Sequence, residues 1–506
     1  MRRLLLPVIL IAAAFLAFRI SDDRGAQTPT AVASADIVSP GTPMLSARRI
    51  PDVLAEPRAF ELVELDLQLV ASQMPSLSCL AAHDADGRDL FSAKGQVGLA
   101  PASLQKLVTA HAVLQHLGPD FTFRTAVMAA SAPVDGVLEG DMFLIGGGDP
   151  LFHSDAYVES YPHAFPYTSA DALADTLIGL GITSITGGVL ANESRYDNLR
   201  QPAAWDGTSL ARDGNTGPLG AMMLDDGFVA FPEVREPGVF STPAGDPALH
   251  AAKAFDDLLE ARAVTIRRGS RNVVELPAGL IEIASVESLP LIEIVGQMLT
   301  FSDNTTAELL LKELGLAFSG DGSTDSGALA AFEILGADAI DLTSVRVVDG
   351  SGLSDENRLS CDAIIALLET HGADSALADA LALSGRPGTL VQRFSSPLLA
   401  GRVHAKSGSL STVTGLAGFV DTARDETVTF AYLVNEEPAV TQIMLDLQTT
   451  LLEFLVNFPA GPPTEELVPL PLGDDPNAIY DAATAPPSPT VTPVPAPTPL
   501  PAEPDA

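Results

Sequence analysis

The stretch Pro101-Ala102-Ser103-Leu104-Gln105-Lys106 begins a helical pattern and decides how the rest of the chain is interpreted. From Ser103 to Leu117 the apolar residues recur on one helical face, and Gly118-Pro119 ends the pattern. Because residues three apart on a helix are neighbours, the Ser103 hydroxyl and the Lys106 amine are predicted to lie side by side. Of the five lysines in the chain, only Lys106 has a serine at this spacing.

A paired serine and lysine points to nucleophilic catalysis. Serine is a poor nucleophile at its own pKa and needs an adjacent base, and a desolvated lysine near another cation loses its proton close to neutral pH. Arginine does not lose its proton in this way. A single Ser-x-x-Lys string also begins many ordinary helices, so the interpretation depends on further strings.

The second string is Ser302-Asp303-Asn304, which lies between the helical patterns of residues 289–300 and 305–314. In this position Ser302 and Asn304 are able to hydrogen-bond an amine and a substrate amide. The alternative interpretation is an ordinary N-cap of the helix that begins at Thr305.

The third string is Lys406-Ser407-Gly408-Ser409, at the end of a strand-like segment. A charged Lys406 would attract a substrate carboxylate, Gly408 would let the substrate approach the backbone, and strand N–H groups would help to form an oxyanion hole. The alternative is an edge strand that carries a solubilising lysine.

The order Ser-x-x-Lys, Ser-x-Asn, Lys-Ser/Thr-Gly is typical of class A β-lactamases and penicillin-binding proteins. The chain resembles, more narrowly, the D-Ala-D-Ala carboxypeptidase/endopeptidase family of low-molecular-mass penicillin-binding proteins, typified by penicillin-binding protein 4. The 195 residues between Lys106 and Ser302 favour this family over the β-lactamases, in which the interval is far shorter. Besides the three strings, the resemblance rests on Gly146-Gly147-Gly148-Asp149-Pro150, Asp349-Gly350-Ser351-Gly352-Leu353-Ser354 and Leu416-Ala417-Gly418.

The resemblance implies an α/β (α+β) fold, in which a transpeptidase/β-lactamase-like domain has an antiparallel sheet flanked by helices. We expect this domain over residues 58–120 and 286–458, interrupted by one or more β-rich inserted domains at 121–285. A hairpin around Asp86-Gly87, three antiparallel strands near residues 402–405, 414–420 and 427–434, and a last helix over 440–458 are expected from the pattern of apolar and turn-forming residues.

The resemblance also implies the roles of single residues. Ser103 would attack the D-Ala carbonyl, Lys106 would act as its base, and Ser302 and Asn304 would relay protons and hold the substrate. Lys406 with Ser407 would engage the substrate carboxylate, beside Gly408, and the N–H groups of Ser103 and Ser409 would form the oxyanion hole. Two residues depart from the usual pattern: Ser407 replaces a threonine, and Leu104, which we expect to face the core, replaces a small or polar residue.

The expected function is that of a serine-type D-Ala-D-Ala carboxypeptidase, a DD-endopeptidase, or both, acting on peptidoglycan stem peptides and inhibited by β-lactam antibiotics. The sequence does not decide whether the terminal D-Ala bond or the cross-link bond is cleaved. The depth of the cleft and its surrounding loops determine which substrates enter, and the motifs do not describe them. The alternatives are a β-lactamase and a non-catalytic cell-wall scaffold. The intact Ser103, Lys106, Ser302, Asn304 and Lys406 argue against the scaffold.

The two ends of the chain differ from its middle. Residues 1–35 have a basic start, an apolar run and small residues, as in a secretory signal peptide or an uncleaved N-terminal anchor. We therefore expect export to the periplasm or cell envelope, with no other membrane span. Residues 36–57 are assigned to a linker, and the Pro-rich residues 459–506 to a disordered tail.

Composition excludes several other classes of protein. A net charge of −37 disfavours binding to nucleic acid or to anionic lipid through a basic face. The eight histidines show no metal-ligand spacing, and the glycines at Gly146 lack the spacing of a nucleotide-binding loop, so neither a metal nor a cofactor is expected. The two cysteines, Cys79 and Cys361, form one disulfide or remain two buried thiols.

Overall fold

The computed structural model describes residues 51–161, 163–205, 216–232 and 241–459. The proposed signal segment, most of the proposed linker and nearly all of the proposed tail lie outside these residues. Residues 56–461 form one compact unit.

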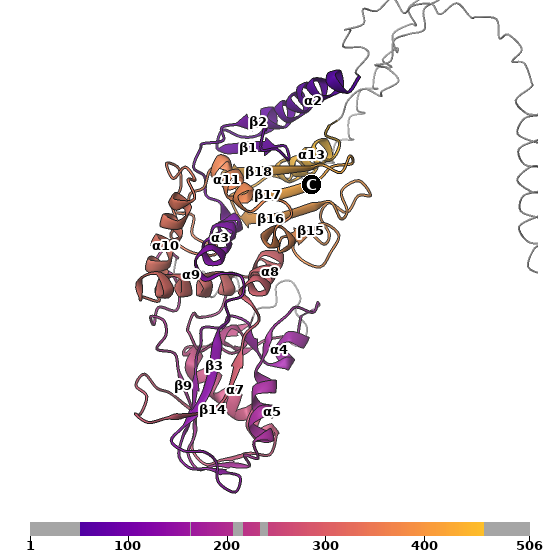
Figure 1. The fold of residues 1–506 in the computed structure, drawn as a ribbon. Coiled ribbons are helices and arrows are strands. Elements are labelled where there is room, and N and C mark those ends of the chain that lie inside the picture. The colour runs from indigo at the N-terminus through magenta and orange to yellow at the C-terminus, as the bar shows by residue number, and fades with distance from the viewer. Residues whose placement is uncertain (1–50, 162, 206–215, 233–240, 460–506) are drawn as a thin grey trace, which may run out of the picture. The chain divides into compact units, whose positions relative to one another are not determined.

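The parts of the chain before and after the proposed insertion at 121–285 form one region. An antiparallel sheet of six strands lies at the centre of this region (Figure 1). Its strand order is β15-β16-β17-β18-β1-β2. The predicted hairpin and the three predicted C-terminal strands are confirmed, and β1 pairs with β18, so the first and last strands of the region are neighbours. The strands are β1 (Ser78–His83), β2 (Asp89–Ala93), β15 (Ala382–Leu383), β16 (Val403–Leu410), β17 (Val413–Asp421) and β18 (Thr427–Asn435).

Helices cover both faces of this sheet because its strands are apolar on both sides. Along β18, Phe430 and Tyr432 pack with the first and last helices, whereas Ala431 and Leu433 pack with the other helices. The expected fold class, an antiparallel sheet flanked by helices, is thus confirmed. The first and last helices are α2 (Pro51–Gln73) and α13 (Gln442–Val456); the others are α3 (Gln105–Leu117), α8 (Leu291–Phe301), α9 (Asn304–Ser319), α10 (Thr324–Ala337), α11 (Cys361–His371) and α12 (Ala376–Asp379).

The linker assignment was wrong at its C-terminal end, because residues 51–57 belong to α2. The apolar spacing that begins in this stretch continues into a buried stripe formed by Val63, Leu67 and Val70. Burial of this stripe against the sheet stabilises the helix and outweighs the presence of Pro57 near its start.

Between α3 and α8 the chain forms a second sheet with the order β13-β9-β5-β3-β14. Its first and last strands in the chain, β3 and β14, pair with each other, so the segment leaves and returns at adjacent points. Its strands are β3 (Arg124–Ala129), β5 (Met142–Ile145), β9 (Val189–Asn192), β13 (Arg271–Asn272) and β14 (Ile281–Glu287); short strands elsewhere in this segment are β4 (Val137–Leu138), β6 (Phe152–His153), β7 (Thr168–Ser169), β8 (Ser184–Ile185), β10 (Phe228–Ala230), β11 (Thr242–Pro243) and β12 (Thr265–Ile266).

This segment also contains helices that the expectation of a β-rich insertion missed. They are α4 (Asp155–Glu159), α5 (Ala170–Gly179) and α7 (Pro247–Ala261). Buried Leu173, Leu177, Phe255 and Leu259 from α5 and α7 pack against the second sheet. Their apolar residues are mostly alanine and leucine, whose helical periodicity is hidden among many glycines and prolines in the sequence.

Buried ion pairs join the inserted segment to α9. Arg195 and Tyr196 both donate to the Glu313 carboxylate, the latter at 2.9 Å, and Lys312 pairs with Asp197. Glu313 and Lys312 are almost fully buried. The inserted segment therefore helps to fix the position of the helix that begins at Asn304.

A disulfide links Cys79 on β1 to Cys361 at the start of α11. It closes a loop of 282 positions, and both residues are buried in the core between the sheet and the helices. The structure thus resolves the pairing that the sequence leaves open.

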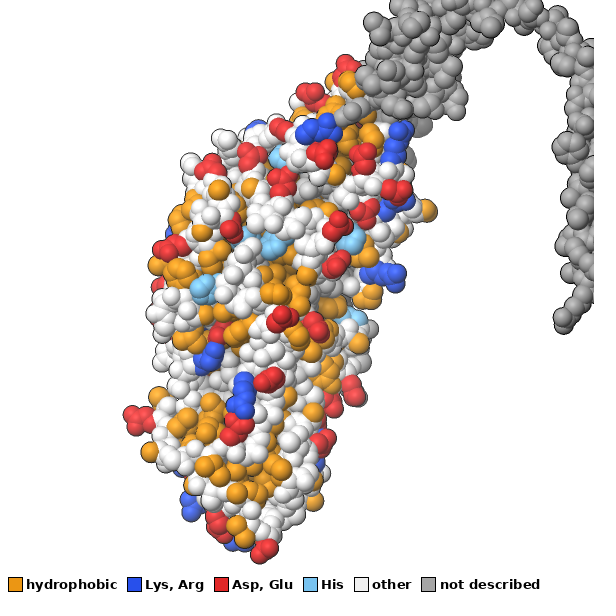
Figure 2. All heavy atoms as spheres, viewed as in Figure 1, with side chains coloured by type: hydrophobic (Ala, Val, Ile, Leu, Met, Phe, Trp, Pro, Cys, Tyr) orange, Lys and Arg blue, Asp and Glu red, His pale blue; other side chains and the backbone are white. Residues whose placement is uncertain are grey.

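The acidic side chains visible on one face of the molecule do not form a single block. On the face drawn in Figure 2, Asp and Glu are scattered among apolar and uncharged groups, and basic side chains stand singly between them. This distribution agrees with a solubilising role for the net charge of −37.

Candidate active site

Ser103 lies in a short 3-10 helix, η2 (Ala102–Leu104), immediately before α3. The preceding residue, Ala102, has a φ of 48°, which is uncommon for a residue with a side chain. Such strain of about 1–3 kcal/mol persists only where surrounding contacts impose it, and it is frequent at functional sites. Ser103 itself is half-buried, while Ala102 and Leu104 are fully buried.

Two glycines permit the close packing around this turn. A Cβ atom on Gly352, whose φ is +85°, would lie 1.9 Å from the Ala102 carbonyl oxygen, and one on Gly408 would lie 2.7 Å from the Pro101 carbonyl oxygen. Gly408 is thus required for packing of β16 against the nucleophile turn, a reason that differs from the expected approach of substrate. Leu104 faces the core as expected, next to Gly408.

Lys106 lies at the centre of the site. Its Nζ donates hydrogen bonds to Ser103 Oγ at 3.0 Å, to Asn304 Oδ1 at 2.7 Å and to the Ser351 carbonyl oxygen at 2.8 Å. The three partners come from η2, from the start of α9 and from the loop after α10. The structure therefore brings Ser103, Lys106 and Asn304 together, as the sequence predicts.

Burial changes the acidity of Lys106. Its side chain is completely buried, and desolvation lowers its pKa to about 8, although the carboxylates of Glu308, Asp349 and Asp303 act in the opposite direction. A lysine with this pKa is partly unprotonated near neutral pH, which meets the requirement for a general base.

Ser302 and Lys406 form the second half of the site. Ser302 ends α8 in a left-handed conformation, with a φ of 63°, and Lys406 Nζ donates to Ser302 Oγ at 2.8 Å and to the Ser407 carbonyl oxygen at 2.8 Å. The N-cap of α9 is Asp303, which accepts from the Thr306 N–H at 3.0 Å. Asp303 and not Ser302 therefore caps α9, so the Ser302 hydroxyl is available to accept the hydrogen bond from Lys406.

The surroundings of Lys406 also change its acidity. Its side chain is fully buried, and desolvation, together with the charge of Lys106, lowers its pKa well below the ordinary value for lysine. An anion that enters the site would oppose this shift, because an opposite charge favours the ammonium form.

Beyond Lys406 the strand β16 is less covered. β15 pairs with β16 only at Ala405 and His404, and Ser407 is half-buried whereas Ser409 is exposed. This end of β16 packs against η2, so the predicted substrate-binding residues Ser407, Gly408 and Ser409 adjoin the turn of Ser103.

Two buried acids, to which the sequence analysis assigns no role, support the site. Glu308 accepts hydrogen bonds from the N–H groups of Gly350 and Ser351, at 3.1 and 2.8 Å. Asp349 accepts from Trp205 Nε1 at 2.8 Å and from Asn357 Nδ2 at 2.7 Å. Asp349 belongs to a string that the sequence singles out, but no motif signal in a single sequence marks Glu308 or Trp205.

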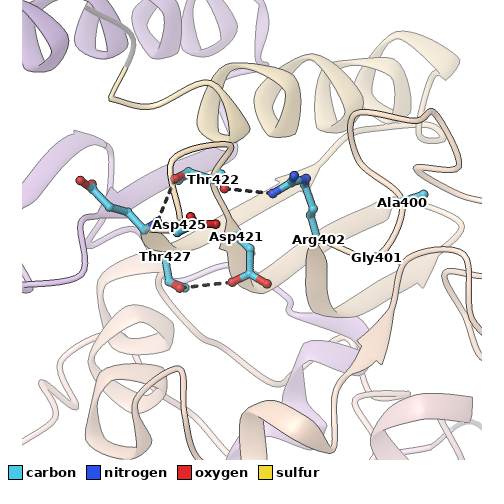
Figure 3. Close-up of a pocket in the computed structure, with 8 residues that line it drawn as sticks. Ala400, Gly401, Arg402, Asp421, Thr422, Asp425 and Thr427 are labelled. Atoms are coloured by element: carbon cyan, nitrogen blue, oxygen red, sulfur yellow. Dashed lines mark hydrogen bonds between the residues drawn. The ribbon is translucent and has the colours of Figure 1, made fainter. Parts of the chain in front are cut away.

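A separate polar hollow of about 440 Å³ lies at the end of β16, β17 and β18 that is opposite Ser407, Gly408 and Ser409 (Figure 3). There Arg402 donates to the Thr422 carbonyl oxygen at 3.0 Å, and Thr427 donates to Asp421 at 3.2 Å. Its lining contains no serine or lysine, so it lacks the nucleophile and base found around Ser103.

The described part of the chain also bears on metal binding and on membrane crossing. Within residues 51–459, outside the undescribed gaps, no group of three or more His, Cys, Asp or Glu side chains is arranged to hold a metal ion. Over the same residues, none of the helices combines the length and the apolar character that a membrane crossing requires.

Comparison with known proteins agrees with this geometry. The chain matches the D-Ala-D-Ala carboxypeptidase 3 (S13) family over residues 65–244 and 230–452. It is 30% identical over 430 residues to a carboxypeptidase of Mycobacterium tuberculosis, covering 82% of this chain and 89% of that protein. It is 28% identical over 411 residues to a D-alanyl-D-alanine carboxypeptidase of an Actinomadura species, covering 66% of this chain and 73% of the relative.

The fold is also found among solved structures. Penicillin-binding protein 4 of Haemophilus influenzae superposes with a TM-score of 0.62 at 22% identity, and the match covers 79% of this chain and 99% of that protein. The long segment between α3 and α8 therefore belongs to an architecture that the two proteins share.

Proposed function

The chain belongs to the D-Ala-D-Ala carboxypeptidase 3 (S13) family and is a serine-type D-Ala-D-Ala peptidase, and we propose that it acts through an acyl-enzyme formed on Ser103. The observation that carries this proposal is the contact of 3.0 Å between Ser103 Oγ and the buried Nζ of Lys106, whose pKa is lowered to about 8. A hydroxyl nucleophile and a base with a suitable pKa are thus adjacent.

In the proposed reaction, unprotonated Lys106 removes the proton of Ser103 as Oγ attacks the carbonyl carbon of the penultimate D-Ala. The N–H groups of Ser103 and Ser409 stabilise the oxyanion. The C–N bond then breaks, and the leaving amine takes a proton from the Lys106 ammonium, relayed through Ser302. Water attacks the ester, returns a proton to Ser103 Oγ and releases the shortened peptide.

Lys406 binds the substrate in this scheme. The hydrogen bond from Lys406 Nζ to Ser302 Oγ at 2.8 Å supports this role, since it holds the amine beside the other residues of the site. A terminal carboxylate placed near Lys406 and Ser407 favours the ammonium form of the lysine and accepts a charge-assisted hydrogen bond from it. Asn304, held by Lys106, is available to the substrate amide.

The proposed substrates are peptidoglycan stem peptides, either at their D-Ala ends or at their D-Ala cross-links. The same acyl transfer serves both bonds, since only the leaving amine differs. We assign the catalytic region to residues 58–120 and 286–458, the inserted region to 121–285, and residues 1–35 to export to the periplasm or cell envelope. β-Lactams would acylate the same Ser103.

Intact-protein mass spectrometry after brief exposure to benzylpenicillin tests the proposal, with the Ser103→Ala variant as control. A persistent adduct of one drug molecule on Ser103, absent from the variant, is the expected result. Rapid hydrolysis of the drug without an adduct would favour a β-lactamase. Folded protein that neither forms an adduct nor hydrolyses the drug would favour a scaffold.

A further inference from the structure

Glu308 is connected to the catalytic lysine through a single residue. It lies one helical turn after Asn304 on α9, so the two side chains share a helix face. Its carboxylate accepts from the N–H of Ser351 at 2.8 Å, and the carbonyl oxygen of the same Ser351 accepts from Lys106 Nζ at 2.8 Å. Glu308, Ser351 and Lys106 are all fully buried.

We propose that Glu308 is a positioning residue that holds the Ser351 carbonyl against Lys106 and supplies the negative charge that sets the pH at which Lys106 becomes the base. This inference rests on the proposed role of Lys106. It assigns to Glu308 an effect on protonation as well as on geometry, and it requires no direct contact of Glu308 with substrate.

The charge is needed because acylation creates a cation inside the protein. When Lys106 takes the proton of Ser103, its ammonium has no water around it, and an isolated buried charge is strongly unfavourable. The charged groups that act on Lys106 or lie beside it are Glu308 and Asp303 from α9, Asp349 from the loop after α10, and Lys406 from β16.

The other two acids have further structural partners. Asp349 accepts from the N–H groups of Gly352 and Ser354, at 2.8 and 2.7 Å, besides Trp205 and Asn357. Asp303 caps α9 and accepts from Gln297 Nε2 at 3.0 Å.

Glu308, by contrast, accepts hydrogen bonds from the N–H groups of Gly350 and Ser351, in the segment that contacts Lys106. Its charge is therefore the one most directly coupled to the lysine.

The acidities of the two groups support this coupling. Burial, followed by the charge of Asp349, raises the pKa of Glu308 to about 8, while burial lowers the pKa of Lys106 to about 8. Among the carboxylates that oppose the lowering of the Lys106 pKa, Glu308 acts most strongly.

Glu308→Gln tests the inference, since it keeps the size and one acceptor of the side chain but removes its charge. The second-order rate of acylation by benzylpenicillin is measured as a function of pH. Loss of the carboxylate lowers the pKa of Lys106, so the rising limb of the profile moves to lower pH by about one unit, and the plateau falls about tenfold.

Glu313→Gln is the matched control, because Glu313 is a buried acid of the same helix that pairs with Arg195 and Tyr196. Its midpoint should equal that of the wild type even where its melting temperature falls. A Glu308→Gln profile with an unshifted midpoint and a uniformly lower rate would overturn the inference and leave Glu308 a purely structural role. A wild type that is not acylated would instead contradict the proposed function.

Should Glu308→Gln fail to fold, Glu308→Asp provides the test, because it keeps the charge on a side chain shorter by one methylene. The expected result is a lower plateau with a midpoint within about 0.3 units of the wild type. A midpoint displaced to lower pH, as if the charge had been removed, would contradict the inference.

Discussion

The two lysines of the active site lie in opposite electrostatic surroundings. The Ser103 region places the carboxylates of Glu308, Asp349 and Asp303 around Lys106, whereas the charge that acts most on Lys406 is the positive one of Lys106. Both side chains are fully buried, so desolvation disfavours the charge on each. The difference between them is therefore made by their neighbours.

This difference separates two tasks within one site. Burial lowers the pKa of Lys106 to about 8 and the nearby carboxylates limit this shift, so the lysine is able both to accept and to release a proton near neutral pH. For Lys406, burial and the charge of Lys106 lower the pKa, and a substrate carboxylate placed beside it would oppose this shift. In the proposed mechanism, one residue type thus serves as base in one region and as anion receptor in the other.

Lys106→Arg is expected to have the largest effect on the chemistry. Arginine keeps the positive charge but does not release its proton, so the rate of acylation by benzylpenicillin should fall by about 10³-fold. Mass spectrometry of the adduct as a function of time measures this rate. Circular dichroism controls for folding, and a folded variant with less than about tenfold loss would show that Lys106 is not the base.

Lys406→Met should have a smaller effect that depends on the substrate. Loss of a charge-assisted hydrogen bond lowers kcat/KM for a peptide ending in D-Ala-D-Ala by about 10- to 100-fold. A peptide with an amidated C-terminus, which lacks the carboxylate, should lose only a few-fold. Equal losses for both peptides would mean that Lys406 acts in the chemistry and not in recognition of the carboxylate.

The pH dependence of the wild type sharpens the comparison further. Because the pKa of Lys106 is lowered to about 8, its basic form increases as pH rises through that value. Acylation at pH 7 should therefore be about tenfold slower than on the plateau above pH 9. Stopped-flow measurement with a chromogenic β-lactam gives this profile, and a rate independent of pH between 6 and 9 would contradict the assignment.

Removal of the disulfide should change stability and leave both lysines unaffected. Cys79→Ser combined with Cys361→Ser opens a loop of 282 positions, which costs about 2–4 kcal/mol of the free energy of unfolding. Chemical denaturation measures this loss. The acylation rate should stay within about twofold of the wild type at 25 °C, and a larger change would indicate that the link between β1 and α11 shapes the site.

Sequence and structure agree where a function is encoded in a local string. Ser103, Lys106, Ser302, Asn304 and Lys406 are recognisable because their spacing follows helix and strand geometry. The antiparallel strands of residues 403–435 are recognisable because turn-forming residues separate their apolar runs. These features need no knowledge of distant contacts.

The features that sequence analysis missed depend on distant contacts. Glu308 is indistinguishable from a surface residue of α9 until the loop at Ser351 is placed beside it. The need for a glycine at position 408 becomes evident only from the neighbouring Pro101 carbonyl oxygen. The Cys79–Cys361 pairing likewise spans 282 positions and is set by the packing of α11 on β1.

The most direct test of the central claim is an NMR titration of the lysine side chains. The chain contains only five lysines, so ¹³C labelling at Cε gives few signals, which Lys106→Arg and Lys406→Met variants assign. Lys106 is expected to titrate at about pH 8, together with the rising limb of the acylation profile. A Lys106 that remains protonated beyond pH 10, or an acylation midpoint that follows Lys406 instead, would contradict it.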